Sequence, residues 1–323
     1  MKPTLAILHA IHRRLVKRHH RKGDHGVVAV GMGWPLKDDK PDRERGLELV
    51  FLVKKIKTKP LPHHKIKDPV TVYFTKKVRG RRKRSLVTFR RHIMEMPAAV
   101  RLTGFPLTSG TESFTGGAVI SWTDPKGAGQ LWGLLTVGHG AASDKVSVAL
   151  PGGAAVDCKV YAQTNGEDAL DAALVLLDSA VVQARLQPFL PPARPVPVVR
   201  SLDDLANNWQ TEPANAFLRT VAGSMAFNVT HYFPGPTNPP IVPQEPNLKD
   251  ILLGHGALQT FAEGTSGSIW AAQAGSVDAI QVAGYPNDDN SALFSNGIAV
   301  AMQDYLDWAS LQLEAPVTLM GAF

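Results

Sequence analysis

The chain has 323 residues, of which 44% are hydrophobic and 20% are charged, as is typical of a globular protein with a buried core. It contains no run of about 18 apolar residues and no signal-peptide pattern, so we expect neither a membrane-spanning helix nor secretion. The only cysteine, Cys158, excludes an intrachain disulfide, and these features together predict an intracellular, cytoplasmic protein.

The net charge of +7 conceals a strong asymmetry between the two parts of the chain. Residues 1–110 contain 27 Lys and Arg against 8 Asp and Glu, which gives +19. Residues 111–323 contain 8 against 20, which gives −12. A split of this size indicates two units with different physical roles.

The first 97 residues predict a small, basic α+β domain. An amphipathic helix is expected over residues 3–22, because Leu5, Leu8, Ile11 and Leu15 recur at helical spacing among Lys and Arg. Strands are expected at 26–31, 47–53, 70–74 and 86–89, with a charged loop at 37–46.

The remaining residues, 98–323, predict a second domain that is mainly β. The whole chain contains 28 glycines and 24 prolines, which indicates many turns and favours a β-rich architecture. Short strands are expected at 117–122, 132–137, 172–177, 224–232 and 279–283. We expect a first β-unit at 112–186, a proline-rich linker at 187–200, a second β-unit at 201–298 and a helix at 299–312.

Three short motifs carry residues suited to nucleophilic catalysis. His139 follows an apolar strand in LTVGHG, Asp171 begins one in LDAALV, and Ser266 is flanked by glycines in EGTSGS. A serine hydroxyl is a weak nucleophile at neutral pH, so an imidazole must take its proton, and a carboxylate must orient that imidazole. The order His, Asp, Ser along the chain is the chymotrypsin order, which differs from the subtilisin and α/β-hydrolase orders.

These motifs resemble those of the trypsin-like serine protease family, over residues 112–312. The resemblance implies a chymotrypsin-like double β-barrel with a C-terminal helix, preceded here by the small α+β domain. It implies that His139 acts as general base and then general acid, that Asp171 orients it, and that Ser266 forms the acyl-enzyme. The backbone N–H groups of Gly264 and Ser266 would form the oxyanion hole. A protein or peptide substrate is implied, with no metal or organic cofactor.

Three positions depart from the family pattern. Gly140 replaces the disulfide cysteine after the histidine, and Thr265 replaces the aspartate before the serine. Thr265 cannot pair with a newly cleaved N-terminus, so we expect no activation of that kind. Thr260 occupies the position that the family places at the base of the primary specificity pocket. Its neutral hydroxyl argues against a preference for Arg or Lys.

Alternatives remain for each of these residues and for the whole domain. Asp168 lies three residues before Asp171 and is a rival for the carboxylate role. His255, in a Gly-His-Gly sequence, is expected near the substrate pocket. The N-terminal histidines lack the cysteine and carboxylate spacing of a zinc site. In the competing hypothesis, the barrels are a catalytically silent scaffold that acts as a binding module.

Three basic clusters, at 17–22, 54–59 and 79–84, mark the first domain. Clusters of this kind attract phosphate backbones and acidic surfaces. The partner could be nucleic acid, an acidic protein, an anionic membrane surface, or the acidic unit of this chain or of another copy. A solvated face without a partner and a regulatory cover over the substrate cleft are further alternatives. The loop at 76–84 is the expected contact element.

Overall fold

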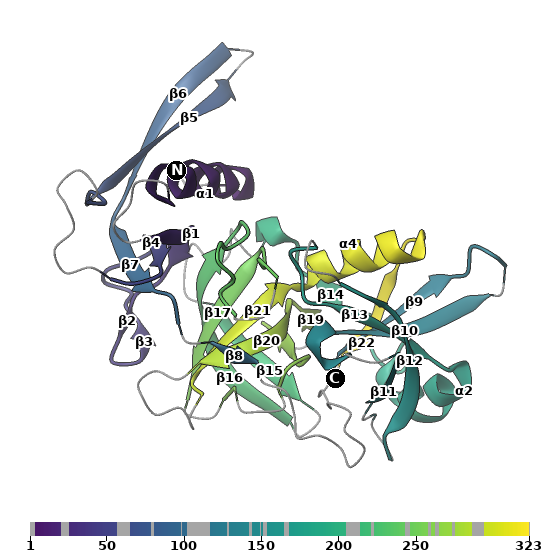
Figure 1. Cartoon of the computed structure of the whole chain (residues 1–323). Helices are drawn as coiled ribbons and strands as arrows, with labels where there is room; N and C mark the ends of the chain where they lie inside the picture. Colours follow the sequence, from purple (N-terminus) through teal and green to yellow (C-terminus); the bar gives the residue numbers. More distant parts are fainter. Residues whose placement is uncertain are drawn as a thin grey trace.

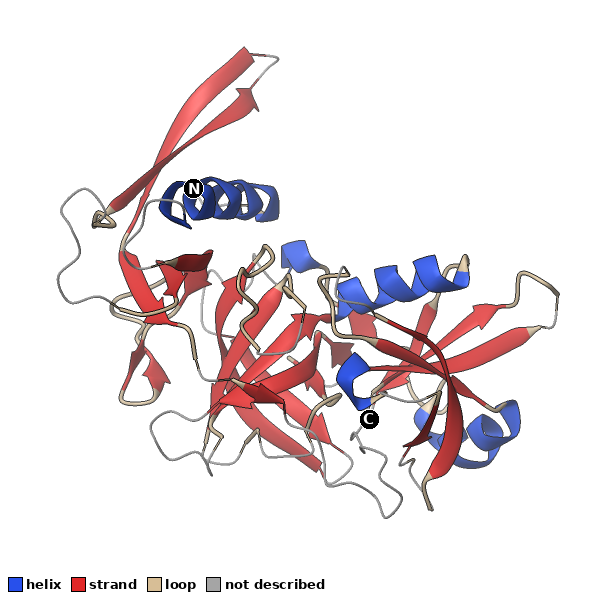
Figure 2. Cartoon of the chain, viewed as in Figure 1, coloured by secondary structure: helices blue, strands red, loops and turns tan. Residues whose placement is uncertain are grey.

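Strands dominate the computed structural model of the chain, and helices are few (Figure 2). The structure describes residues 4–20, 26–56, 65–78, 81–97, 99–101, 117–127, 129–141, 144–148, 150, 154–164, 168–204, 214–220, 223–242, 246–257, 260–261, 265–272, 275–285 and 294–322. The expected architecture is confirmed: the chain is mainly β, with two β-barrels, a C-terminal helix and a helix before the first strand.

The second barrel is a closed ring of six antiparallel strands. Its strands are β15 (Ala214–Thr220), β16 (Gly223–Phe233), β17 (Ile251–Gly256), β18 (Ile269–Ala271), β20 (Ala279–Tyr285) and β21 (Asn296–Ala301). They pair in the order β15-β18-β20-β21-β17-β16, and β15 pairs with β16 to close the ring. Closure removes the exposed edges that an open sheet would present to other chains.

The first barrel is a six-stranded antiparallel sheet in the order β11-β12-β13-β10-β9-β22. The strands are β9 (Ala118–Thr123), β10 (Gln130–Thr136), β11 (Lys145–Val148), β12 (Val156–Gln163), β13 (Ala173–Leu177) and β22 (Thr318–Ala322). Strand β22 follows the helix α4 (Met302–Leu313) and returns to the first barrel, where it pairs with β9. No pattern in the sequence predicts this return.

Helical turns precede the predicted proline-rich linker at 187–200 and extend into its first residues. These turns are α2 (Ser179–Val181), a π turn at Val182–Leu186 and a 3-10 turn at Gln187–Phe189. Asp178 begins them, because its carboxylate accepts the N–H of Ala180 at 2.7 Å. After the prolines, β14 (Val198–Val199) pairs in parallel with β19 (Ser276–Val277).

One buried apolar cluster joins the two barrels. It contains Ile120 and Leu135 of the first sheet, Val282 and Ile298 of the second barrel, and Trp308 of α4. Full burial of a side chain of this size contributes roughly 1.5–3 kcal/mol, so the shared cluster holds the barrels together firmly. In Figure 1, α4 lies across the boundary between them.

The N-terminal strands extend the sheet of the second barrel. These strands are β1 (Val27–Gly33), β4 (Glu48–Val53) and β7 (Arg91–Glu95), and they continue from β16 in that order. Glycine at 33 permits the crossing with β16, since a Cβ there would lie 2.1 Å from the His231 ring. Every residue of β1 and β4 is buried, which explains their apolar runs. Helix α1 (Leu5–His20) packs on them through buried Leu8, Ile11 and Leu15.

Two small hairpins and one short strand complete the N-terminal region. They are β2 (Leu36–Lys37) with β3 (Lys40–Pro41), β5 (Val70–Val78) with β6 (Arg81–Phe89), and β8 (Val100–Arg101), which pairs with β20. The expected loop at 76–84 is largely strand, because pairing of β5 with β6 continues from Val70↔Phe89 to Val78↔Arg81. Among the described residues, no helix combines the length and apolar character that crossing a membrane requires.

Candidate active site

His139 lies at the end of β10, on a single 3-10 turn formed by Gly138–Gly140. The turn is held by Gln163, whose Nε2 donates to the Gly138 carbonyl at 2.7 Å. Glycine is needed at position 138, because a Cβ there would lie 2.8 Å from Oδ1 of Asp171. The glycine at position 138 therefore allows the backbone to approach the Asp171 carboxylate closely.

Asp171 lies two residues before β13, and β13 is the direct neighbour of β10. The pairing Thr136↔Ala173 brings the two strand ends together. Oδ1 of Asp171 accepts the backbone N–H of His139 at 2.9 Å, and Oδ2 lies 2.5 Å from Nδ1 of His139. With a proton on Nδ1, the imidazole is oriented with its Nε2 lone pair facing away from the carboxylate. Asp171, rather than its rival Asp168, supplies these contacts.

Ser266 comes from the second barrel, in the turn that precedes β18. Gly267 adopts a φ of 89°, which favours glycine, and its N–H donates to the Gln281 carbonyl at 2.8 Å. Oγ of Ser266 lies 3.2 Å from Nε2 of His139 and 3.1 Å from the carbonyl oxygen of Val282. The hydroxyl has one hydrogen to donate, so the imidazole and the carbonyl compete for it.

The structure thus brings together His139, Asp171 and Ser266 in an unbroken chain of hydrogen bonds. All three are buried: Ser266 is 1% exposed, Asp171 3% and His139 7%. Low exposure strengthens electrostatic interactions within the cluster, because water screens them less.

Tyr305 of α4 contacts this cluster through the backbone of Asp171. Its side chain is fully buried, and its hydroxyl donates to the backbone carbonyl of Asp171 at 2.9 Å. The sequence predicts the helix but not this contact. In the sequence, Tyr305 and Trp308 are both aromatic residues on the apolar face of this helix. Nothing there distinguishes a tyrosine that hydrogen-bonds to the site from one that only packs in the core.

Two other predicted positions have different outcomes. Gly264 lies outside the described residues, so its place in an oxyanion hole stays a prediction. Thr260 is buried, and its hydroxyl donates to the Ala257 carbonyl at 2.8 Å. The hydroxyl therefore holds a local turn together, which is a structural role at the position that the resemblance assigns to the specificity pocket.

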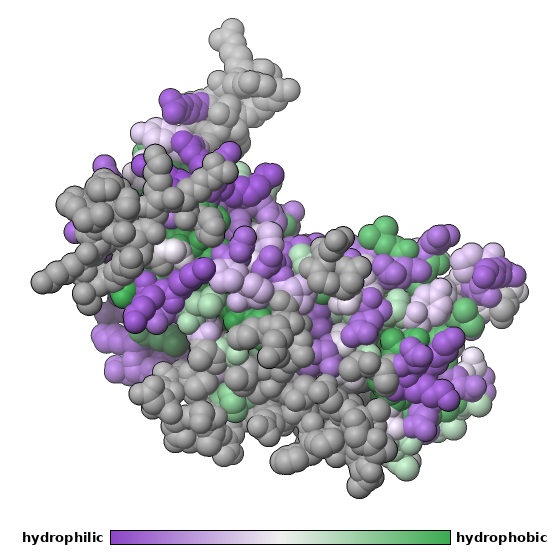
Figure 3. All heavy atoms as spheres, in the orientation of Figure 1, coloured by the Kyte–Doolittle hydropathy of each residue, from purple (hydrophilic) through white to green (hydrophobic). Residues whose placement is uncertain are grey.

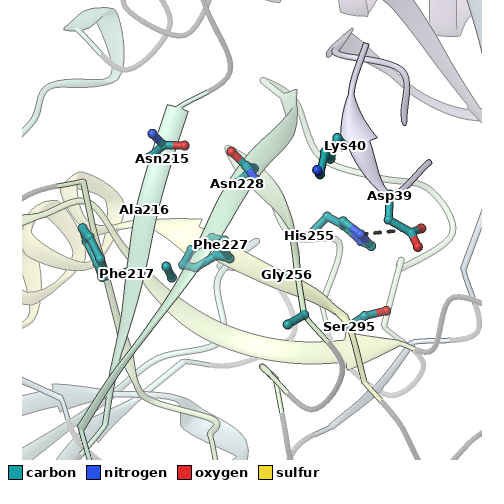
Figure 4. Close-up of a pocket in the computed structure, with 12 residues that line it drawn as sticks. Asp39, Lys40, Asn215, Ala216, Phe217, Phe227, Asn228, His255, Gly256 and Ser295 are labelled. Atoms are coloured by element: carbon teal, nitrogen blue, oxygen red, sulfur yellow. Dashed lines mark ion pairs between the residues drawn. The ribbon is translucent and has the colours of Figure 1, made fainter. Parts of the chain in front are cut away.

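A cavity of about 560 Å³ lies beside this turn, between the β2–β3 hairpin and the second barrel (Figure 4). Its lining consists of Asp39, Lys40, Asn215, Ala216, Phe217, Ala226, Phe227, Asn228, His255, Gly256, Ala257 and Ser295. His255 is fixed by a hydrogen bond between Nδ1 and Oδ1 of Asn296 at 2.8 Å, and its Nε2 lies 3.8 Å from Oδ1 of Asp39. His139 and Ser266 do not line this cavity.

A buried acidic cluster lies at the start of α4, close to Tyr305. Oδ1 of Asp250 accepts the Tyr232 hydroxyl at 2.5 Å, and Oδ1 of Asp304 lies 2.8 Å from Nζ of Lys249. Burial, reinforced by the charge of Asp304, raises the pKa of Asp250 to about 7. Burial also raises the pKa of Asp304. The two carboxylates therefore retain protons at a higher pH than exposed ones do.

Two histidines outside the candidate site, His12 of α1 and His231 of β16, are buried against protein atoms. Nδ1 of His12 is 2.9 Å from the Val30 carbonyl, and burial lowers the pKa of His12. His231 is fully buried, and burial lowers its pKa to about 3. Within the ranges that the structure describes, no group of three His, Cys, Asp or Glu side chains is arranged to hold a metal ion.

No family model matches the chain, and no curated protein matches it. The solved structures it is similar to include the HtrA-type protease AlgW with a decapeptide, at 13% identity and a TM-score of 0.40, covering 62% of this chain and 64% of that one. They also include an inactive form of a mutant Rv3671c from M. tuberculosis H37Rv, at 15% identity and 0.34, covering 61% and 85%. The MamO protease domain from Magnetospirillum magneticum matches at 14% identity and 0.34, covering 59% and 95%. Two structures of an AlgW variant, with a tripeptide and with a decapeptide, also match. The chain spans only 59% and 63% of their lengths, and 64% of the length of AlgW with a decapeptide.

Proposed function

We propose that this protein is a serine hydrolase that cleaves peptide bonds through an acyl-enzyme. The observation that carries the proposal is the chain of contacts from Oδ2 of Asp171 to Nδ1 of His139, at 2.5 Å, and from Nε2 of His139 to Oγ of Ser266, at 3.2 Å. A nucleophile within reach of a base, with the base oriented by a third group, is the arrangement that activates a serine hydroxyl.

In the proposed reaction, Oγ of Ser266 attacks the carbonyl carbon of the scissile bond while Nε2 of His139 accepts the hydroxyl proton. The resulting imidazolium is stabilised by Asp171, which stays ionised. His139 then donates the proton to the leaving amine, and the C–N bond breaks to leave an ester on Ser266. A water molecule, deprotonated by His139, attacks this ester, and the proton returns to Oγ as the acid product leaves.

Two steps of this scheme make specific demands on the residues. The Ser266 hydroxyl must turn from the Val282 carbonyl towards His139, which exchanges one hydrogen bond for another and costs little. The oxyanion of each tetrahedral intermediate needs N–H donors, and we assign them to the backbone of Gly264 and Ser266. One such donor typically contributes about 2.7–4 kcal/mol to transition-state stabilisation.

A second candidate function is a catalytically silent scaffold that acts as a binding module. The burial of the cluster favours this candidate, since the side chain of His139 is 0% exposed. A scaffold keeps the hydrogen bonds as structural links between the barrels, whereas an enzyme must admit a substrate to Ser266.

A fluorophosphonate probe separates the two functions. It loses fluoride to an activated serine and leaves a stable phosphonyl ester, so the hydrolase predicts labelling of the folded protein. Labelling should disappear in Ser266→Ala and remain in Ser268→Ala, which changes a buried serine of the same turn. Hydrolysis of a denatured protein substrate should follow the same pattern. Folded protein that neither reacts with the probe nor cleaves the substrate would support the scaffold instead.

The proposal also covers the location of the protein and the role of its basic N-terminal region. We propose an intracellular endopeptidase without cofactor, whose basic N-terminal region recruits substrate or a partner, or regulates access. The contrast of +19 in residues 1–110 with −12 in residues 111–323 supports a separate task for that region.

A further inference from the structure

The hairpin formed by β5 and β6 projects away from the body of the molecule (Figure 1). Within the described part of the chain, its strands pair only with each other, through nine pairs from Val70↔Phe89 to Val78↔Arg81. An isolated two-stranded hairpin is marginally stable in water, so its base needs support from the body. That support is present: Val70 and Val72 are buried in the N-terminal core, and Arg14 of α1 donates to the Tyr73 carbonyl at 3.2 Å.

The hairpin is strongly and uniformly basic. Between Asp68 and Glu95 the sequence has nine basic residues and no acidic one. The nine are Lys76, Lys77, Arg79, Arg81, Arg82, Lys83, Arg84, Arg90 and Arg91. A run of this charge without internal carboxylates repels itself, and a polyanion relieves that repulsion.

The strand register distributes the basic positions over both faces of the hairpin. Paired residues lie on one face of an antiparallel ribbon, and successive pairs alternate between faces. The pair Lys76↔Lys83 therefore occupies one face, and the pair Lys77↔Arg82 occupies the other. A partner that presents negative charge on both sides of the hairpin matches this distribution.

One face also carries exposed apolar surface. Tyr73 is 43% exposed and its paired residue Leu86 is 54% exposed. The guanidinium carbon of Arg84 lies 4.5 Å from the centre of the Tyr73 ring, which holds the arginine flat along the strand. In the space-filling view, the described residues around the base of the hairpin are mainly hydrophilic (Figure 3).

We infer that the β5–β6 hairpin is a docking element for double-stranded DNA and that it enters the major groove. Two strands lie about 4.8 Å apart, and nine residues span about 30 Å, close to one helical turn of duplex. The major groove of B-DNA, about 12 Å wide, admits a two-stranded ribbon. Phosphates line both walls of the groove, so the basic residues along both strands of the ribbon would find anionic partners there.

Other polyanions fit the hairpin less well. A hairpin that inserts into a bilayer needs apolar side chains at its tip, whereas the sequence at the turn is VRGR. An acidic protein surface would engage one face and leave the basic residues of the other unpaired. The deep, narrow major groove of A-form RNA excludes a ribbon of this width.

The direct test is binding of the full chain to a fluorescently labelled DNA duplex of mixed sequence at increasing salt. The inference predicts binding at low salt that falls steeply as salt rises. Neutralising four positions, Arg81→Gln, Arg82→Gln, Lys83→Gln and Arg84→Gln, should weaken binding by about 10²-fold or more. It should also reduce the slope of log K against log salt by about 3–4.

A matched control removes four positive charges elsewhere. Lys126→Gln, Lys145→Gln, Lys159→Gln and Arg194→Gln change exposed residues in and beside the first barrel and should leave the slope nearly unchanged. Equal losses in both variants would show that net charge, not the hairpin, attracts DNA, and would overturn the inference. Absence of duplex binding by the unaltered chain at low salt would overturn it too.

A second measurement uses the unaltered chain and does not depend on the folding of any variant. Bound duplex should protect the Lys and Arg residues of the hairpin from limited digestion by trypsin. Polyglutamate and vesicles of anionic phospholipid are compared with the duplex at equal charge concentration. Equal protection by either one would contradict the groove fit and would indicate an acidic protein or a membrane as the partner. Fluorophosphonate labelling is read separately, so this inference and the proposed hydrolase activity can fail independently.

Discussion

The two contacts of His139 are of very different kinds. Its contact with Asp171 joins neighbouring strands of one sheet across 32 residues of sequence, with two hydrogen bonds of 2.5 and 2.9 Å. Its contact with Ser266 joins the two barrels across 127 residues, with one contact of 3.2 Å that a backbone carbonyl shares. The first contact is set by strand pairing, and the second depends on how the barrels pack.

This difference indicates which contacts control the geometry of each half of the site. The His139–Asp171 pair is assembled whenever the first sheet is formed, whereas the distance to Ser266 follows the barrel interface and α4. Tyr305 and Asp304 are consecutive residues of α4, so the helix carries both the support for Asp171 and part of the buried acidic cluster. Substitutions at the two kinds of contact should therefore have separable effects.

The largest effect is expected from breaking the contact within the sheet. Asp171→Asn keeps the shape of the side chain but removes the charge that stabilises the imidazolium and fixes its tautomer. We expect kcat/KM for peptide hydrolysis to fall by about 10⁴-fold. Asp168→Asn is the matched control, and its kcat/KM should change by less than about threefold if Asp171 alone fills the carboxylate role. A larger loss in Asp168→Asn would reverse the assignment.

A smaller effect, on stability, is expected from the acidic cluster beside α4. The pKa of Asp250 is raised from 3.8 to about 7 in the folded protein, so the folded state binds more protons than the unfolded state between these values. Stability should therefore decrease as pH rises from about 4 to 7. Asp250→Asn keeps an acceptor for Tyr232 and removes this loss. We expect it to stabilise the protein at pH 8 by on the order of 2–4 kcal/mol.

Thermal unfolding at several pH values measures this effect. The difference in Tm between wild type and Asp250→Asn should be small near pH 4 and grow as pH rises. Asp144→Asn, at an exposed position, is the control and should follow the wild-type profile. Parallel curves for wild type and Asp250→Asn would show that the carboxyl group ionises without cost.

The smallest effect is expected at the joint between α4 and the site. Tyr305→Phe leaves the buried carbonyl of Asp171 without its donor, which should cost about 1–3 kcal/mol of stability. If the hydroxyl also positions Asp171, kcat should fall by several-fold with KM unchanged. Tyr161→Phe, at a residue that is 48% exposed, is the control. An unchanged kcat with lower stability would limit Tyr305 to a structural role.

Local patterns in the sequence were enough to locate most strands and the three site residues. The strands expected at 117–122 and 172–177 are β9 (Ala118–Thr123) and β13 (Ala173–Leu177), each shifted by about one residue. The motif around His139 predicted its place at a strand end, because an apolar run that stops at glycine is a local signal.

Pairings between distant segments could not be predicted in this way. The pairing of β1 with β16 and of β22 with β9 depends on which strand edges meet in space. The spacing of apolar residues along the sequence does not contain that information. The high charge density of the run from Lys76 to Arg84 favours a loop rather than a strand. Cross-strand pairing from the hairpin base overrides that preference.

The return of β22 also has a consequence for biosynthesis. Strand β9, whose other neighbour β10 leads into His139, pairs with a partner that is translated only after the second barrel and α4. Until residues 318–322 have been translated, β9 lacks this neighbour and one edge of the first barrel stays unpaired. The first sheet therefore gains this strand only after the second barrel and α4 have been synthesised.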